Sequence, residues 1–283
     1  MQDKGEIPLT YYEICARFEA AGLEDAAADA AVLLAYFGGI STATLPFRKN
    51  ENIVDPRLAR AVEQRANHYP LQYLVGEWGF CGQTYEVNEH TLIPRSDTET
   101  LVEEALKLLP RGACFADLCT GSGCIAISTL CMRRDTMAHA VDLFPETLAV
   151  AERNAVRNGV RDRVTFLCAD VLRPLPIEAG TLDAILSNPP YIRTEVVATL
   201  APELAYEPAA ALDGGGDGLD FYRAILRLHT PLLKEDGVIL FEIGYDQGED
   251  LRRMAGESGF ECRIVRDLGG CDRVAVLTRK TER

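Results

Sequence analysis

The sequence lacks the cysteine patterns that mark structural metal sites and disulfide scaffolds. Its nine cysteines are an odd number, contain no CxxC pair and stand in no Cys/His quartet with zinc spacing. We therefore expect no metal, and we interpret the cysteines as small buried hydrophobic residues in a reducing compartment. A catalytic thiol stays open as an alternative, because the base that it needs can come from elsewhere in the chain.

The chain also lacks long apolar runs, a secretory leader and an excess of positive charge. No apolar run approaches the roughly 20 residues that a membrane helix needs. The N-terminal stretch MQDKGEIPLTYYE has no basic region followed by an apolar stretch and a cleavage site. The formal net charge of -14 argues against broad neutralisation of nucleic-acid phosphates, although a local basic patch stays open. We expect a cytoplasmic protein that binds a small molecule or a protein, with no membrane and no direct nucleic-acid partner.

The length of 283 residues suits one small domain and one large domain. Three amphipathic helices are expected in residues 1–72, which we interpret as a helical domain. Thr10 and Glu13 form a capping box before the first helix, and Asp55-Pro56 begins the third. Aromatic and β-branched residues around glycine then predict a β-hairpin linker over residues 73–94.

Residues 95–283 alternate between apolar strands and helices, which is typical of a parallel sheet with helices on both faces. The predicted strands are 114–118, 137–141, 163–169, 182–187, 237–243, 261–265 and 273–278. The last two are separated only by RDLGGCD, which is too short for a helical crossover, so they should pair as an antiparallel hairpin. The fold class expected is therefore α/β, with the seven-stranded Rossmann-like sheet of class I methyltransferases.

A glycine turn follows the first predicted strand of this sheet. The strand runs through Asp117 into Thr120-Gly121-Ser122-Gly123, and a helix begins near Cys124. Glycines permit a tight turn and close approach of the backbone to a ligand, while the helix offers free N–H groups. A nucleotide-like cofactor would fit there, but short turns of this kind also occur in ordinary loops.

Asp142 strengthens the case for a cofactor. It closes the second predicted strand nineteen residues after Gly123, where a carboxylate can accept both ribose hydroxyls of an adenosine. Taken alone, Asp142 is equally an N-cap before Pro145. Together with the glycine turn it predicts an adenosine cofactor and leaves the choice between NAD and S-adenosylmethionine open, because Ala126 at the third glycine position does not discriminate.

The tetrapeptide Asn188-Pro189-Pro190-Tyr191 decides this choice. It is compatible with a simple strand-terminating turn, since two prolines cannot continue a sheet. In the functional interpretation, the prolines hold the Asn188 side-chain carbonyl and the Pro189 backbone carbonyl toward a pocket. Both carbonyls can accept hydrogen bonds from one NH2 group, and Tyr191 can stack on a planar substrate. This arrangement predicts methylation of a planar amide or amine nitrogen, with S-adenosylmethionine as the donor.

Such a transfer depends chiefly on positioning the nitrogen in line with the methyl group. The two carbonyls would also stabilise the positive charge that develops on the nitrogen. No strong general base is needed, because methylation acidifies the nitrogen. The four histidines are scattered in the sequence and are expected to be structural: His68, His90, His139 and His229.

Further motifs extend over most of the chain. In order they are Pro70-Leu71-Gln72-Tyr73, Gly76-Glu77-Trp78, Leu92-Ile93-Pro94-Arg95, Asp97-Thr98-Glu99, Tyr206-Glu207-Pro208, Leu212-Asp213-Gly214-Gly215, Asp217-Gly218-Leu219 and Phe241-Glu242-Ile243-Gly244. With the glycine turn and the Asn-Pro-Pro-Tyr tetrapeptide, they resemble the release factor glutamine methyltransferases of the HemK/PrmC family from about residue 10 to 279. The resemblance implies methylation, by S-adenosylmethionine, of the glutamine amide in the GGQ loop of bacterial class 1 release factors.

The resemblance also implies roles for individual residues. The implied cofactor contacts are Asp117, Thr120, Gly121, Ser122, Gly123, Cys124, Asp142, Asp170, Val171 and Asn188. The implied substrate contacts are Arg95, Glu99, Asn188, Pro189, Pro190 and Tyr191, the last four being catalytic. The helical domain would contact the release factor. Ser96 and Val171 depart from the family pattern, which has a second proline and a bulkier residue at these positions.

Two alternatives stay open. A methyltransferase for adenine or guanine in nucleic acid would share the tetrapeptide, but would need a base-flipping pocket and a basic approach surface. A non-catalytic adaptor that keeps the cofactor fold would be indicated by loss of Asn188 or of the glycines, and all of these are present.

Overall fold

The computed structural model describes residues 8–280, which divide into two compact units. Among the described residues, the helical unit comprises 8–76 and Ala201–Tyr206, and the α/β unit comprises Glu77–Leu200 and 207–280. Residues 1–7, part of the stretch in which we expect no secretory leader, lie outside the described residues. Within residues 8–280, no helix has both the length and the apolar character needed to cross a membrane.

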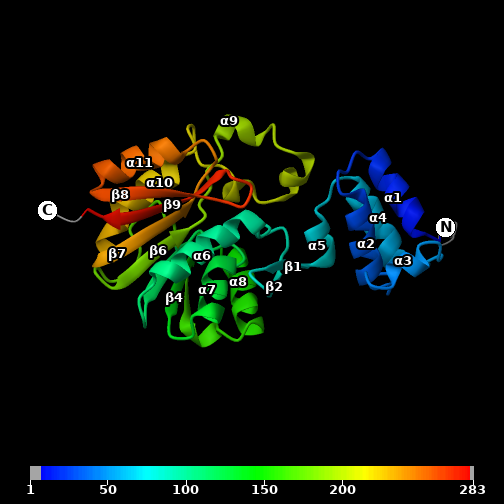
Figure 1. Ribbon diagram of the computed structural model, residues 1–283, viewed down its shortest axis with the longest axis horizontal. Helices are drawn as coiled ribbons and strands as arrows, with labels where there is room; N and C mark the ends of the chain where they lie inside the picture. Colours follow the sequence, from blue (N-terminus) through cyan, green and yellow to red (C-terminus); the bar gives the residue numbers. More distant parts are fainter. Residues whose placement is uncertain (1–7, 281–283) are drawn as a thin grey trace. The chain divides into compact units, whose positions relative to one another are not determined.

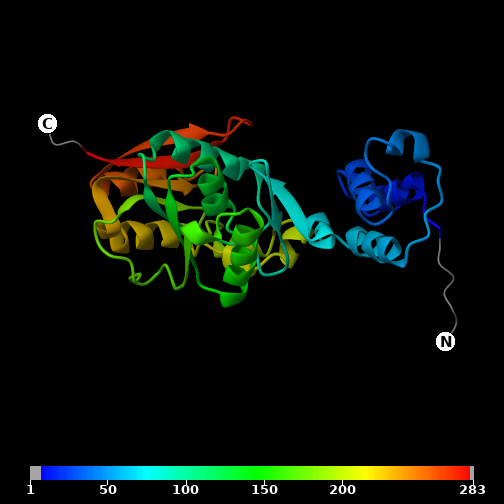
Figure 2. The ribbon, with the colours of Figure 1, turned by 90° about the horizontal axis from the view of Figure 1, so that it is seen from below.

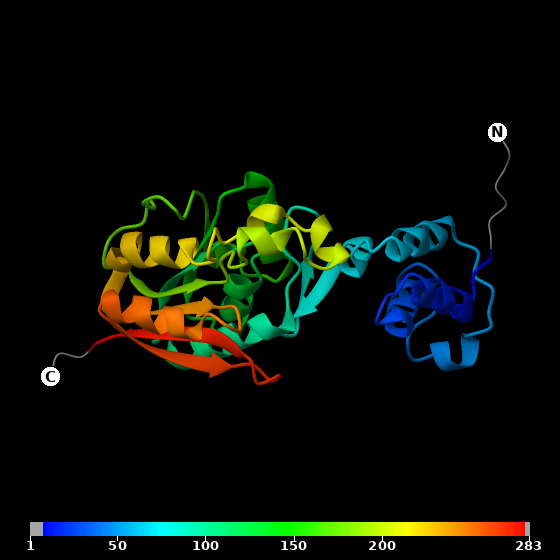
Figure 3. The same cartoon turned by 90° about the horizontal axis from the view of Figure 1, so that it is seen from above.

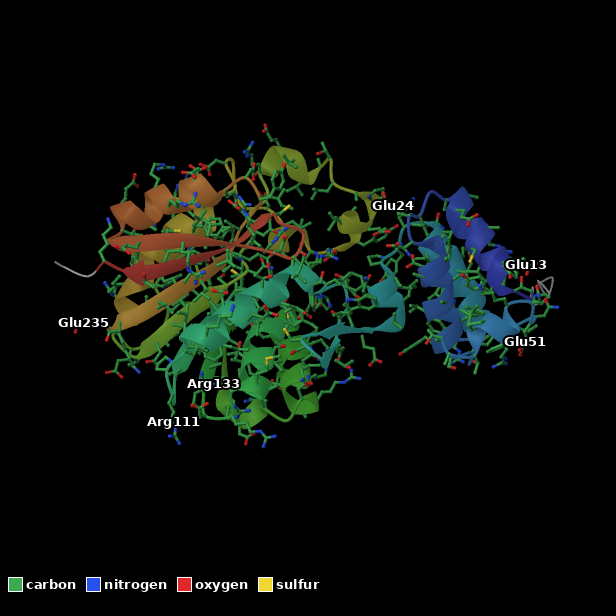
Figure 4. All side chains as sticks on the ribbon, viewed as in Figure 1. Glu13, Glu24, Glu51, Arg111, Arg133 and Glu235 are labelled. Atoms are coloured by element: carbon green, nitrogen blue, oxygen red, sulfur yellow. The ribbon has the colours of Figure 1, made fainter. Side chains whose placement is uncertain are left out.

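The helical unit contains the three expected helices and two short ones (Figures 1 and 2). They are α1 (Tyr11–Ala20), α2 (Ala26–Tyr36), α3 (Leu45–Arg48), α4 (Pro56–Ala66) and α5 (Leu71–Val75). The predicted capping box is confirmed: Glu13 N donates to Thr10 Oγ1 at 3.3 Å, and Thr10 N donates to Glu13 Oε2 at 2.8 Å. Figure 4 labels Glu13 near the start of α1.

The segment that begins at Leu71 differs from the sequence-based expectation. We expected a hairpin linker over residues 73–94, but residues 73–75 belong to the helix α5 (Leu71–Val75), and only Glu77–Phe80 (β1) and Gln83–Glu86 (β2) form the antiparallel hairpin. Pro70 stands at the N-cap of α5, and Gly76 ends it with a φ of 75°. Only glycine adopts that backbone conformation at little cost, so the helix stops there.

A segment far along the chain completes the helical unit. Ala201–Tyr206 is joined to α4 by Arg65, whose guanidinium pairs with Glu203 at 2.6 Å and with Asp29 of α2 at 2.7 Å. The Tyr206 hydroxyl donates to the Asn67 carbonyl at 3.1 Å. The contacts of Glu203 and Tyr206 connect residues more than 130 positions apart, and no local pattern predicted them.

The N-cap of α4 provides a stability prediction. Asp55 Oδ1 accepts from Arg57 N at 2.7 Å, so Asp55→Ala should cost about 1 kcal/mol of unfolding free energy. Asp25 is the matched control, because it occupies the N-cap of α2 without a side-chain capping bond, and Asp25→Ala should have little effect. Urea unfolding followed by circular dichroism measures both variants, and amide hydrogen exchange across α4 localises the change. Equal losses in the two variants would contradict the assignment.

The α/β unit is built on a seven-stranded sheet in the order β5-β4-β3-β6-β7-β9-β8 (Figure 1). The strands are β3 (Cys114–Leu118), β4 (Met137–Asp142), β5 (Val164–Cys168), β6 (Leu182–Ser187), β7 (Leu233–Glu242), β8 (Phe260–Arg266) and β9 (Asp272–Arg279). β3 to β7 pair in parallel, and β9 runs antiparallel to both β7 and β8. The expected fold class and the reversed last strand are therefore confirmed.

Helices cover both faces of this sheet (Figure 3). They are α6 (Glu99–Leu108), α7 (Cys124–Met132), α8 (Pro145–Arg157), α10 (Asp220–Leu228) and α11 (Gly248–Glu257), while the short α9 (Thr194–Val197) belongs to the segment that connects β6 to α10. Alternate strand residues face two separate cores: Phe115 packs with residues of α6 and α7, and its neighbour Ala116 packs with residues of α10 and α11. Short 3-10 turns occur at Ser96–Thr98 (η1), Arg161–Arg163 (η2), Pro202–Tyr206 (η3), Ala209–Ala211 (η4) and Thr230–Leu232 (η5).

Candidate functional site

A cavity of about 450 Å³ lies in the α/β unit at the carboxyl ends of the parallel strands. Each of the four neighbouring strands contributes a residue at or just beyond its end: Cys119 after β3, Asp142 at the end of β4, Asp170 after β5 and Asn188 after β6. Ligands of open parallel sheets bind at this edge, where the strand order reverses. The volume is in the usual range for a small-molecule site.

The predicted glycine turn forms one wall of the cavity. Gly121 and Gly123 have φ values of 56° and 82°, and a Cβ on Gly123 would lie 2.7 Å from Ile127 Cδ1. The turn is held from below by Asp117, whose Oδ2 accepts from the Thr120 hydroxyl at 2.6 Å and from the Ala126 N–H at 3.1 Å. Burial raises the pKa of Asp117 to about 7, against these hydrogen bonds, which lower it.

Only Gly121 of this turn lines the cavity. Thr120, Ser122, Gly123 and Cys124 support it from behind, in line with their low exposure. The carbonyl of Ser122 accepts from Asn154 Nδ2 at 2.9 Å, which ties the turn to α8. Of the predicted cofactor residues in this turn, Gly121 borders the cavity, and the roles of the others stay predictions.

Asp142 lines the cavity beside this turn. Its Oδ2 accepts from Gly121 N at 3.0 Å, and its Oδ1 accepts from Phe144 N at 3.2 Å. Burial raises the pKa of its carboxyl group, and the backbone hydrogen bonds oppose that rise. Because each carboxylate oxygen can accept more than one hydrogen bond, both oxygens keep capacity for the hydroxyl pair of a ribose.

Apolar residues form the neighbouring wall. Leu143 and Phe144 line the cavity although they are 51% and 41% exposed, and the buried Val171 also lines it. The Val171 carbonyl is bonded to Nε2 of the buried His229 at 2.8 Å, which anchors the turn after β5. Sequence reasoning missed Leu143 and Phe144. They could have been recognised as two apolar residues in the loop between a strand end and a helix N-terminus, because neither the strand nor the helix requires apolar residues there.

The tetrapeptide after β6 forms the other side of the cavity. Asn188 and Pro190 line it, and Pro189 is buried. The Asn188 Nδ2 atom donates to Thr98 Oγ1 at 3.3 Å, and the Oδ1 atom takes no part in this contact. The Tyr191 hydroxyl donates to Glu242 Oε1 at 3.3 Å, so this ring is held by the core of the α/β unit.

Residues 212–218 fix the backbone of the tetrapeptide. Gly214 packs so closely that a Cβ there would lie 2.7 Å from the Pro190 carbonyl oxygen, and a Cβ on Gly218 would lie 2.4 Å from the Tyr191 carbonyl oxygen. Gln247 Nε2 also donates to the Tyr191 carbonyl at 3.0 Å. The glycine-rich loop therefore holds the tetrapeptide rigidly. At Gly214 and Gly218 the two backbones lie too close together for any residue with a side chain.

Arg95 and Glu99 both have structural partners. The Arg95 guanidinium pairs with Glu207, which is 5% exposed and also accepts from Ile93 N at 2.9 Å. Glu99 Oε1 accepts from Cys81 N at 2.7 Å and thereby caps the turn of the hairpin. Neither residue lines the cavity, and their predicted contact with a substrate stays a prediction.

The cavity fits an adenosine cofactor with a sulfonium group. A carboxylate at the end of β4 suits a ribose, the apolar wall at Leu143 and Phe144 suits a purine, and the glycine turn allows close approach. No group of metal-ligating side chains occurs within residues 8–280. The tetrapeptide contributes the side-chain amide of Asn188 and Pro190 to the lining, whereas Pro189 and Tyr191 do not line the cavity, and the predicted role of the Pro189 carbonyl stays a prediction.

Comparison with protein families shows two matches. The PrmC N-terminal domain matches residues 12–76, and the methyltransferase small domain matches residues 96–229. The alternation of strands and helices described above falls largely in the second of these ranges.

Similar proteins cover nearly the whole chain. A release factor glutamine methyltransferase from Moorella thermoacetica is 38% identical over 278 residues, 95% of this chain and 97% of the relative. Another from Geobacter sulfurreducens is 42% identical over 215 residues, 75% of this chain and 74% of the relative. The crystal structure of a ribosomal protein L11 methylase from Lactobacillus delbrueckii is similar with a TM-score of 0.50 and 20% identity, over 69% of this chain and 84% of that one, and shares the fold.

Proposed function

The chain belongs to the release factor glutamine methyltransferase family, and from this premise we propose that it methylates the side-chain amide nitrogen (N5) of the glutamine in the GGQ motif of bacterial class 1 release factors. The observation that carries the proposal is the placement of Asn188 and Asp142 on one cavity. An acceptor for an NH2 group and a carboxylate suited to a ribose therefore face the same space. S-adenosylmethionine supplies the methyl group from its sulfonium sulfur.

On the donor side, Asp142 would accept the ribose hydroxyls and Gly121 would let the backbone approach. Asp170 and Val171 would border the purine together with Phe144, because all three line the cavity. Asp117, Thr120, Ser122, Gly123 and Cys124 would act mainly by holding the glycine turn in shape. Such preorganisation lowers the entropic cost of bringing the methyl group to its acceptor.

On the acceptor side, the Asn188 side-chain oxygen and the Pro189 carbonyl would accept the two protons of the glutamine NH2 group. These bonds orient the nitrogen lone pair and stabilise the positive charge that develops on it. Pro190 and Tyr191 would shape the slot for the amide. Arg95 and Glu99 would serve the substrate indirectly, through Glu207 and the hairpin turn.

We further propose a division of labour along the chain. Residues 1–72 would contact the release factor, residues 73–94 would link the domains, and residues 95–283 would carry the transfer. The match of residues 12–76 to a domain found in this family supports the first assignment. All nine cysteines are free, which supports a place in the reducing cytoplasm, where release factors act.

The test of this function is a labelling experiment. Purified protein with radiolabelled S-adenosylmethionine should label a bacterial class 1 release factor, and the label should be absent from a release factor with Gln→Ala in the GGQ motif. Scintillation counting of the separated products measures the difference. Equal labelling of both release factors, or preferential labelling of RNA, would overturn the substrate assignment.

A further inference from the structure

Gln247 stands at the N-cap of α11, but its side chain forms no capping hydrogen bond there. Residues that cap helices well, such as Ser and Asp, have short side chains that reach the first free N–H groups of the helix. The Gln247 side chain is longer, the residue is 6% exposed, and its amide contacts the Tyr191 carbonyl of the tetrapeptide instead. The function proposed above assigns no role to this buried amide.

Four hydrogen bonds use the whole capacity of the Gln247 amide group. Its Nε2 atom donates to the Tyr191 carbonyl at 3.0 Å and to the Gly218 carbonyl at 3.1 Å. Its Oε1 atom accepts from Gly244 N at 2.9 Å and from the Tyr222 hydroxyl at 3.2 Å. A carbonyl can only accept and a backbone N–H can only donate, so the three backbone partners fix the orientation of the amide.

The amide joins segments that are far apart in the chain. Its Nε2 atom contacts the last residue of the tetrapeptide and the last residue of the glycine-rich loop, residues 212–218. These two segments also pair directly, because Gly214 N donates to the Ile192 carbonyl at 2.8 Å and Ile192 N donates to the Leu212 carbonyl at 3.0 Å. Gln247 therefore adds a side-chain link to two backbone segments that already contact each other.

Both segments contribute to the lining of the cavity. Asn188 and Pro190 come from the tetrapeptide, and Asp213 and Gly215 come from the glycine-rich loop. The two proline rings of the tetrapeptide fix two of the backbone φ angles between Asn188 and Tyr191. Because few torsions remain free over this distance, a displacement of the Tyr191 carbonyl is passed on to Asn188.

We propose that Gln247 is a positioning residue for the methyl transfer, which holds the tetrapeptide against the glycine-rich loop and thereby fixes the acceptor side of the cavity. This inference rests on the proposed function, in which Asn188 binds the substrate amide. Gln247 does not line the cavity, so it acts through the backbone that it holds. Transfer to an amide nitrogen depends on its alignment with the methyl group, and a small displacement of the tetrapeptide therefore lowers kcat more than cofactor affinity.

The first test removes the four hydrogen bonds with a side chain of similar length. Gln247→Met should lower kcat for release factor methylation about tenfold at saturating cofactor, the equivalent of one net hydrogen bond. The Kd for S-adenosylmethionine, measured by calorimetry, should stay within about threefold, because Asp142 and Gly121 follow other strands. Gln83→Met is the matched control in the same unit, since Gln83 of β2 does not line the cavity, and its kcat should equal that of the wild type. Parallel losses of kcat and cofactor affinity in Gln247→Met would overturn the proposal.

The second test keeps the shape of the side chain and changes its protons. In Gln247→Glu, an ionised carboxylate cannot donate to the two carbonyls, whereas the protonated form can donate to one of them. The ratio of the variant kcat to the wild-type kcat should therefore rise about tenfold as the pH falls from about 9 to about 6, because burial raises the pKa of the introduced carboxyl group.

The comparison with the wild type at each pH accounts for the groups nearby. Glu242, whose backbone carbonyl shares the Tyr222 hydroxyl with Gln247, titrates in both proteins. Gln247→Met introduces no titratable group, and its ratio to the wild type should not change with pH. A ratio for Gln247→Glu that is equally independent of pH would contradict the role of the donated hydrogen bonds.

A third measurement needs no substrate and separates this proposal from the proposed function. The backbone amides of Ile192 and Gly214 pair the two segments, and NMR measures their exchange with solvent. In Gln247→Met both should exchange about tenfold faster, whereas in Gln83→Met they should exchange as in the wild type. Failure of the wild type to label a release factor would overturn the function alone, and unchanged exchange in Gln247→Met would overturn the positioning role alone.

Discussion

Asn188→Ala is expected to lower kcat about a hundredfold to a thousandfold while the Kd for S-adenosylmethionine changes only a few-fold. The size follows from losing one preorganised group that stabilises developing charge, which typically costs about 3 to 4 kcal/mol. Asn188 is anchored at 3.3 Å to the buried Thr98, so its oxygen needs little reorganisation during the reaction. The measurement combines steady-state methylation of a release factor with calorimetry of cofactor binding.

Asn158→Ala is the matched control for this prediction. Asn158 also donates through Nδ2, to the Thr84 carbonyl at 3.1 Å, but it does not line the cavity. Its kcat should stay within a few-fold of the wild type. A large loss of cofactor affinity in Asn188→Ala, with kcat preserved at saturating cofactor, would mean that Asn188 serves the cofactor and not the amide.

Asp142→Ala is expected to weaken the binding of S-adenosylmethionine about a hundredfold. Two hydrogen bonds from ribose hydroxyls to a carboxylate contribute about 1.5 kcal/mol each, and about 3 kcal/mol corresponds to that factor. The variant also removes the bonds from Gly121 N and Phe144 N, which position the turn and the apolar wall. Calorimetric titration of the variant with S-adenosylmethionine measures the loss, and kcat at saturating cofactor should fall much less than affinity.

Asp135→Ala tests whether the loss is specific to the cavity. Asp135 stands before the first residue of β4, whereas Asp142 is its last residue. Like Asp142, Asp135 accepts a hydrogen bond from a backbone N–H, that of Gly112, at 2.8 Å. It also pairs with Arg133, which Figure 4 labels. Like Asp142→Ala, Asp135→Ala removes a carboxylate that caps a loop at one end of β4. Its cofactor affinity should nevertheless stay near the wild-type value. A comparable loss in both variants would contradict the proposed ribose contact.

The elements of the sheet were predictable because each leaves a local pattern. Largely apolar segments such as 182–187 mark strands buried on both faces, and the short RDLGGCD segment permits only a hairpin. Asp142 and Asn188 could be placed near one another from sequence, since the ends of parallel strands meet at one edge. Their presence on one cavity agrees with that reasoning, while their chemical roles stay predictions.

Other features depend on contacts between distant residues. The hairpin linker predicted from residue 73 overlaps the end of the helix at Leu71–Val75, because aromatic and β-branched residues favour a strand, whereas Pro70 and Gly76 bound a helix. The segment Ala201–Tyr206 joins the helical unit through Arg65, across a separation that no periodicity reports. Glu207 and Arg95 likewise meet only in the folded chain.

The sequence by itself determined the family, the class of fold and the two polar ends of the site, because strand periodicity, glycine turns and the Asn-Pro-Pro-Tyr tetrapeptide are local properties of the chain. Only the tertiary structure decided which residues hold the tetrapeptide in place. The Asn188 side chain contacts Thr98, about ninety residues earlier, and the Tyr191 hydroxyl donates to Glu242, about fifty residues later. Contact between such distant residues exists only after the chain has folded.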